Sequence, residues 1–204
     1  MDIKDIETLL NTFKTFKWNT LRKMYGNSHS SIIGFISTEW INSSDGNSIL
    51  DGAPSSKSKT DNKRKNADIL LCKGDKPFIP VEVETNVSKY RDKLESLGMY
   101  LDDKKNFDGA RFGLMIMLNF CKNKATGELY KHNWNKIKED IVKNKKHNIV
   151  LVSIEKENKK KQLTDSTLDN LRERNNYYPW DIVEVKYWIY YDNKELEGDF
   201  IEKK

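Results

Sequence analysis

The sequence predicts an α/β protein in which helices flank a central mixed β-sheet. Two short apolar runs within 67–84 flank a turn, as in a hairpin, and an amphipathic helical pattern follows at 87–101. Two nearly continuous apolar runs of strand length come next, at 112–120 and 148–154, with another helical pattern between them. The order strand, helix, strand, helix, strand is typical of parallel strands joined by right-handed crossovers.

Composition limits the class of protein. The 204 residues suit one domain spanning 1–204, and 37% hydrophobic with 33% charged residues is the balance of a soluble globular protein. Lys and Asn are abundant throughout the chain, so the net charge of +5 alone says little about partners. It would indicate a polyanionic partner only if the basic side chains were clustered. No apolar run reaches the roughly 18 to 20 residues that span a bilayer, and no signal-peptide core opens the chain. We therefore expect a cytoplasmic protein that does not contact membranes. Two cysteines without Cys-x-x-Cys spacing argue against a disulfide framework or a zinc knuckle.

The N-terminal part is predicted to be helical. Apolar side chains recur at helical spacing over 2–16, which indicates a packing helix. A shorter helical stretch at 18–24 is expected to end at Gly26 as a C-terminal cap. The stretch 31–41 fits neither the helical nor the strand period well, and we favour a helix or helical turn that carries Glu39.

The stretch 42–66 is predicted to be a flexible basic loop. It is rich in Ser, Asn, Asp, Gly and Lys and shows no evident secondary structure. Its second half gathers the basic residues Lys57, Lys59, Lys63, Arg64 and Lys65. Such a loop either stays solvated or becomes ordered on a phosphate backbone, where these side chains would neutralise charge.

The hairpin after this loop carries a candidate site. If Cys72 pairs with Phe78, Asp68 lies directly opposite Glu82, and Glu84 shares their face of the sheet. Alternation places the apolar residues Ile69, Leu71, Ile79, Val81 and Val83 on the other face.

Two facing carboxylates need a positive partner. Their Cβ atoms lie roughly 4.5 to 5.5 Å apart, and such a like-charge pair destabilises a sheet unless a cation sits between them. A hard divalent cation takes oxygen ligands and is commonly held by one or two carboxylates with water and phosphate. The pair Asp68 and Glu82 therefore predicts a site for Mg²⁺ or Mn²⁺.

The C-terminal third extends this arrangement. A helix at 164–175 and a strongly aromatic strand at 181–191 are expected within a C-terminal extension, 156–204. The aromatic residues form either a capping layer or subunit interface, or a surface that stacks on bases beside the basic cluster at 156–161.

The hairpin motif resembles the active site of the PD-(D/E)XK nucleases, which include many type II restriction endonucleases. Asp68 begins one strand, positions 69–81 intervene, and Glu82-x-Glu84 lies on an apolar strand followed by a helix. The resemblance covers roughly 60–120. It implies a restriction-endonuclease-like fold, metal ligation by Asp68 and Glu82, and a catalytic trio completed by Glu84.

The sequence departs from the family pattern at one position. Glu84 stands where the family usually has Lys, although some members carry an acidic residue or Gln there. An alternative register places Asn86 in the Lys position. Lys89, in the first turn of the following helix, is a candidate for a migrated lysine and for contact with nucleic acid. The family often adds an acidic ligand from a preceding helix, and Glu39 is the candidate here.

The expected function is metal-dependent hydrolysis of phosphodiester bonds in double-stranded DNA, as in a type II restriction endonuclease. A homodimer is expected, because cutting both strands of a palindrome needs two sites related by a twofold axis. The alternatives are a catalytically inactive nucleic-acid-binding domain of the same fold, and a structure-selective resolvase or repair nuclease. The sequence contains no phosphate-binding loop, dinucleotide-binding turn or serine nucleophile elbow.

Overall fold

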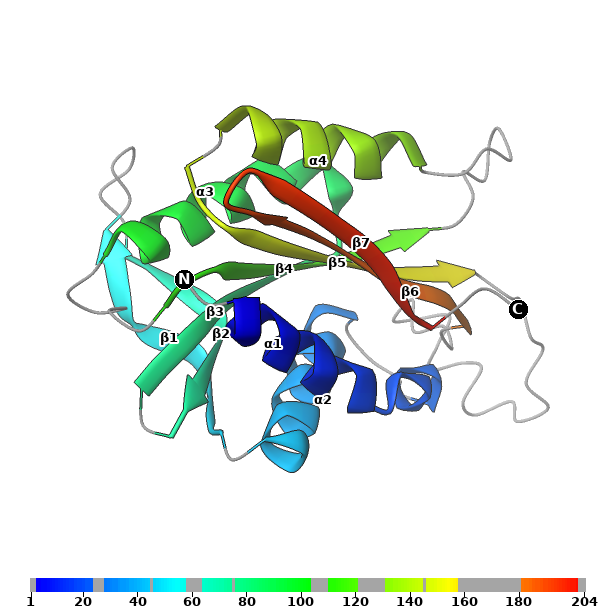
Figure 1. Cartoon of the computed structure of the whole chain (residues 1–204). Coiled ribbons are helices and arrows are strands. Elements are labelled where there is room, and N and C mark those ends of the chain that lie inside the picture. The colour runs from blue at the N-terminus through cyan, green and yellow to red at the C-terminus, as the bar shows by residue number, and fades with distance from the viewer. Residues whose placement is uncertain are drawn as a thin grey trace.

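The described strands form one mixed sheet in which spatial order follows chain order, β1 to β7 (Figure 1). The computed structural model describes residues 3–23, 28–44, 46–57, 64–74, 76–103, 110–120, 131–144, 146–157 and 181–201. The strands are β1 (Ser48–Lys57), β2 (Arg64–Lys73), β3 (Lys76–Glu84), β4 (Gly113–Phe120), β5 (Ile149–Glu157), β6 (Asp181–Tyr191) and β7 (Lys194–Ile201). The pairs β3/β4 and β4/β5 are parallel and the other four are antiparallel. This confirms the predicted α/β class with a mixed sheet.

Helices cover both faces of the sheet (Figure 1). They are α1 (Ile3–Thr15), η1 (Trp18–Lys23), α2 (Ser28–Ser43), η2 (Val87–Lys89), α3 (Tyr90–Asp102) and α4 (Lys131–Asn144). Apolar side chains of α1, η1 and α2 pack in a first core on one face, and those of α3 and α4 pack in a second core on the other. The strand β4 is apolar at nearly every position because it contributes side chains to both cores.

The hairpin of β2 and β3 has the register that the hydrophobic alternation predicts. Ile69 pairs with Val81 and Leu71 with Ile79, and the apolar side chains of this set face the first core. The prediction fails close to the turn, where Cys72 pairs with Pro77 instead of Phe78. The strands extend further than expected, since Gly74 adopts φ of +58° and permits a turn of two residues. A β-bulge between the Leu71 and Cys72 pairs accommodates the one extra residue of β3.

At the flanks of the sheet, one expectation is corrected and another is confirmed. The stretch 42–66 contains β1, which pairs with β2, so it is not a loop throughout. Few apolar residues and a proline within β1 concealed this strand, and both are common at sheet edges. At the other flank, β6 confirms the strand expected at 181–191, and β6 and β7 continue the sheet beyond β5. The expected helix at 164–175 and the cap at Gly26 lie outside the described residues. No helix in the described part of the chain is both long and apolar enough to cross a membrane.

Candidate functional site

Asp68 and Glu82 lie on neighbouring strands, on the face of the sheet that α3 covers. The backbone N–H of Val83 donates to Oδ2 of Asp68 over 2.8 Å, which fixes the carboxylate of β2 against β3. The Asp68 side chain is 17% exposed, whereas that of Glu82 is 2% exposed. The structure therefore brings together the two carboxylates that the hairpin register placed opposite each other.

A lysine of α3 supplies the positive partner of this pair. Nζ of Lys93 lies 2.9 Å from Oδ2 of Asp68 and 2.6 Å from Oε2 of Glu82. Both carboxylates raise the pKa of Lys93 and outweigh the opposing effect of its burial. The sequence predicted a cation between the two acids, and in this structure that cation is an ammonium group.

Tyr100 holds the second oxygen of Glu82. Its hydroxyl donates to Oε1 over 3.1 Å, seven residues and about two helical turns beyond Lys93 on the same face of α3. Burial raises the pKa of Glu82 to about 7, the nearby charge of Asp68 adds to the rise, and Lys93 opposes it. Burial and the Glu82 charge also raise the pKa of the Tyr100 hydroxyl.

His29 reaches Asp68 from the first turn of α2. Its Nε2 lies 3.3 Å from Oδ2 of Asp68 and 3.1 Å from the carbonyl oxygen of Val83. Burial alone would raise the pKa of Asp68, but His29, Lys93 and the Val83 N–H outweigh it and hold this pKa well below its usual range. In turn, the hydrogen bond to Asp68 raises the pKa of His29.

Glu84 lies on the same face of β3 but has a different hydrogen bond. Its Oε1 accepts from the backbone N–H of Asn86 over 2.6 Å, just after the strand ends. The side chain of Asn86 accepts from the backbone N–H and the hydroxyl of Ser88, at 3.1 and 2.8 Å. Asn86 is thus engaged in the turn that starts η2, and Glu84 borders the site without bridging it.

The structure does not bring Glu39 to the carboxylate pair. Oε2 of Glu39 accepts from the backbone N–H of Lys17 over 2.7 Å, so this side chain fastens α2 to the end of α1. Glu39 and His29 are ten residues apart on α2, about 15 Å along the helix axis. His29, rather than Glu39, is the residue of α2 that contacts Asp68.

The lysine of α3 that contacts the carboxylate pair is Lys93, one turn beyond the candidate Lys89. Lys89 is exposed at the end of η2. The sequence contained a signal for Lys93 and Tyr100. Each lies three positions after an apolar residue of the helical pattern at 87–101, Tyr90 or Leu97, and residues three apart share one face of a helix. No comparable local pattern marked His29.

The predicted basic residues fall partly on paired strands. In the sheet, Lys57 pairs with Arg64, and Lys65 pairs with Ser56 across the same two strands. This basic end of β2 leads directly into Asp68. Lys59 and Lys63 lie outside the described residues.

The carboxylate pair has the donor chemistry that a divalent cation requires. Oδ2 of Asp68 and Oε2 of Glu82 converge on one point, the position of the Lys93 ammonium. Hard oxygen ligands from two carboxylates, completed by water and phosphate, suit Mg²⁺. The described residues hold no group of three or more His, Cys, Asp or Glu arranged for a metal. In donor type, these two carboxylates fit a cation held by two protein ligands, and Lys93 occupies the position between them.

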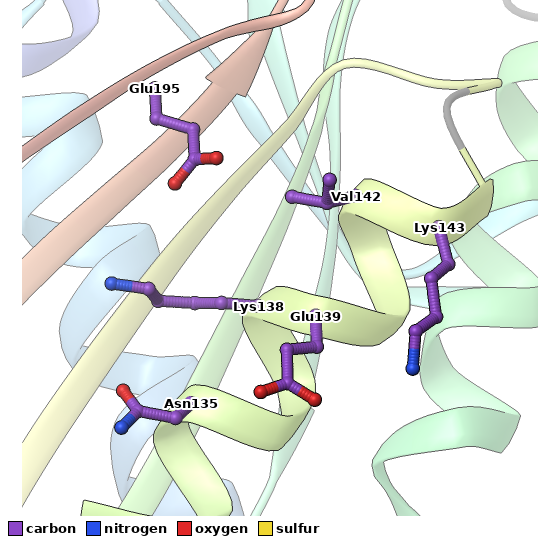
Figure 2. Close-up of a pocket in the computed structure, with 6 residues that line it drawn as sticks. All are labelled: Asn135, Lys138, Glu139, Val142, Lys143 and Glu195. Carbon is purple, nitrogen blue, oxygen red and sulfur yellow. The ribbon is translucent and has the colours of Figure 1, made fainter.

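A pocket of about 380 Å³ lies elsewhere, between α4 and the start of β7 (Figure 2). Its lining residues are Asn135, Lys138, Glu139, Val142, Lys143 and Glu195. Lys138 is paired with Glu197 at 2.9 Å, and Glu195 accepts from the indole N–H of Trp188 at 3.1 Å. Lys138 and Glu195 are therefore already engaged within the protein.

No protein-family model, curated protein or solved structure matches this chain.

Proposed function

We propose that the chain is a metal-dependent endonuclease that hydrolyses phosphodiester bonds in double-stranded DNA, of the type II restriction kind. The convergence of Asp68, Glu82 and Lys93 within hydrogen-bonding distance supports this proposal. Asp, Glu and Lys are the residue types of the usual PD-(D/E)XK motif, whereas the resemblance placed Glu84 in the Lys position. In this proposal, the lysine comes from α3, the helix after β3. Glu84 occupies the position in β3 where the family usually has this lysine.

Each group has a role in the proposed reaction. Hydrolysis needs an activated water, neutralisation of the charge that builds on phosphorus, and stabilisation of the leaving 3′ oxygen. A bound Mg²⁺ would act as a Lewis acid and lower the pKa of its water. Asp68 and Glu82 would hold the ion, and the ammonium of Lys93 would neutralise the phosphate. Glu84 would accept a hydrogen bond from the attacking water.

The surrounding contacts keep the two ligands in place. Tyr100 fixes one oxygen of Glu82, while His29 and the Val83 N–H fix the carboxylate of Asp68. Ligands oriented before the reaction lower its cost, because less reorganisation accompanies it. We propose a homodimer on double-stranded DNA, with one such site for each strand.

One observation favours a second candidate function. The Lys93 ammonium already neutralises the carboxylate pair, which is the arrangement expected if a lysine had permanently replaced the metal. The chain would then be a catalytically inactive domain that binds nucleic acid.

A cleavage assay separates these candidates. Plasmid and branched DNA are incubated with the full chain and Mg²⁺, Mn²⁺ or EDTA, and products are resolved on gels. Metal-dependent discrete fragments support the restriction-type endonuclease, and cuts at branches point to a resolvase or repair nuclease. Binding without any cleavage identifies the inactive domain.

Three variants assign the cleavage to this site. Asp68→Asn and Glu82→Gln keep side-chain size and remove a negative ligand, so each should lower the cleavage rate by roughly 10²-fold or more while DNA binding persists. Glu39→Gln is the matched control and should cleave at the parental rate, since its carboxylate contacts the Lys17 backbone instead. If Asp68→Asn and Glu82→Gln both cleave at the parental rate, this site does not carry out the cleavage.

A further inference from the structure

We propose that Lys93 is an internal counter-cation that occupies the place of the divalent ion and must withdraw before a metal binds. This inference rests on the proposed function, since it concerns metal entry to the same carboxylate pair. Its basis is the position of Nζ, 2.9 Å from Oδ2 of Asp68 and 2.6 Å from Oε2 of Glu82.

The ammonium and a metal ion exclude each other at this position. Both would use the same two oxygen atoms, and Mg²⁺ binds such oxygens at about 2.0 to 2.1 Å. Two cations sharing these ligands would also repel each other at short range in a site where Glu82 is almost fully buried. Metal affinity is therefore set by competition with a side chain of the same protein.

Withdrawal of Lys93 leaves the ligands in position. Glu82 keeps the hydrogen bond from Tyr100, and Asp68 keeps the Val83 N–H and His29. The Lys93 side chain is 22% exposed, and its flexible four-carbon stem can move toward solvent without a change in α3. From its withdrawn position, the ammonium would contact the phosphate of a substrate bound at the carboxylate pair. Metal entry and delivery of the lysine are thus coupled in one exchange.

Metal binding to the full chain tests the competition. Isothermal titration calorimetry with Mn²⁺ compares the parent with Lys93→Met, which keeps the aliphatic stem and removes the charge. Lys93→Met should bind Mn²⁺ at least about tenfold more tightly, because the competing cation is gone. Lys136→Met, which removes an exposed lysine of α4, should bind as the parent does.

A second measurement needs no substitution at the site. Amine acetylation of the parent protein, quantified by mass spectrometry with and without Mn²⁺, reports how accessible each lysine is. Mn²⁺ should raise the labelling of Lys93 several-fold and leave Lys136 unchanged. This readout decides the question if Lys93→Met does not fold.

The outcomes distinguish the two proposals. Equal Mn²⁺ affinity in the parent and Lys93→Met, with unchanged Lys93 labelling, overturns the exchange and leaves the metal site standing. Absence of Mn²⁺ binding in parent and variant alike overturns both the exchange and the metal-dependent function. Binding that is lost in Asp68→Asn confirms that the titrated ion enters this site.

Discussion

Lys93 donates a 2.6 Å hydrogen bond to Glu82, a carboxylate with 2% of its side chain exposed. The two residues come from α3 and β3, which pack directly on each other. Removing one partner of a buried ion pair costs about 3 to 5 kcal/mol, because the other charge is left without compensation. This pair consequently ties the stability of the fold to the chemistry of the candidate site.

The raised pKa of Glu82 predicts a specific dependence of stability on pH. Its value is about 7 in the folded chain, against an ordinary value of 4.5. Between these values the folded chain holds a proton that the unfolded chain has released. Linkage then requires the contribution of Glu82 to the free energy of unfolding to fall as pH rises from about 4.5 to about 7. At 1.36 kcal/mol per pKa unit, the difference between about 7 and 4.5 limits the loss to about 3 to 4 kcal/mol.

Denaturant unfolding of the parent and Glu82→Gln at several pH values measures this loss. The parent should lose stability relative to Glu82→Gln between pH 4.5 and 7.5, since Gln does not titrate. The contribution of His29 has the same direction, as its raised pKa gives stability that is lost at higher pH, but it is present in both proteins. The contribution of Asp68 is lost only as pH falls below its ordinary value near 4. Parallel stability curves for the two proteins would contradict a raised Glu82 pKa.

The hairpin register could be derived from the sequence because its determinants are local. Alternating apolar residues such as Ile69 and Val81 allow one register that buries them all, and this register set Asp68 against Glu82. The turn was less predictable, since a bulge moved Cys72 by one position. The polar strand β7 carries no alternation that would mark it, so its presence depends on pairing with β6.

The remaining site residues depend on contacts between distant segments. Lys93 and Asp68 are 25 residues apart, and the lysine chosen from the sequence, Lys89, lies one helical turn before the one that contacts the site. His29 contacts Asp68 from a helix that packs with the first core, which required the three-dimensional arrangement of α2. The choice of Glu39 failed for the same reason, because helix position alone does not say which turn reaches the sheet.

The basic end of the β1/β2 pair should contribute to DNA binding. Replacing Lys57, Arg64 and Lys65 with Ala is expected to weaken binding equally for all DNA sequences, because phosphate contacts carry no sequence information. The slope of log affinity against log salt should flatten by up to about 0.9 per lost phosphate contact.

Fluorescence anisotropy with two unrelated duplexes between 50 and 200 mM salt measures both quantities, and Lys143→Ala on the exposed side of α4 is the control. A salt slope identical to that of the parent would show that these three residues make no phosphate contacts.

Glu84 has two possible roles, and one substitution separates them. Its Oε1 accepts from the Asn86 N–H over 2.6 Å, a contact that Gln can also make. Glu84→Gln should therefore fold like the parent, which thermal melting can verify. If the Glu84 charge receives the proton of the attacking water, cleavage by Glu84→Gln falls by roughly 10²-fold, the scale of a lost general base. Cleavage at the parental rate would reduce Glu84 to a cap at the end of β3.

Moving the lysine from position 93 to position 84 gives a sharper test of the site than Glu84→Gln. Glu84→Lys introduces a lysine where the PD-(D/E)XK motif, which the hairpin resembles, usually has one. It also places a second ammonium near Lys93 and removes the acceptor for Asn86, so we expect it to be inactive. In the double variant Glu84→Lys with Lys93→Met, one ammonium again faces the pair Asp68 and Glu82, now from β3. The double variant should cleave faster than either single variant in the same plasmid assay, because a single cation is again available to the substrate phosphate. If it is no faster than Glu84→Lys alone, the lysine of α3 has a role that position 84 cannot supply.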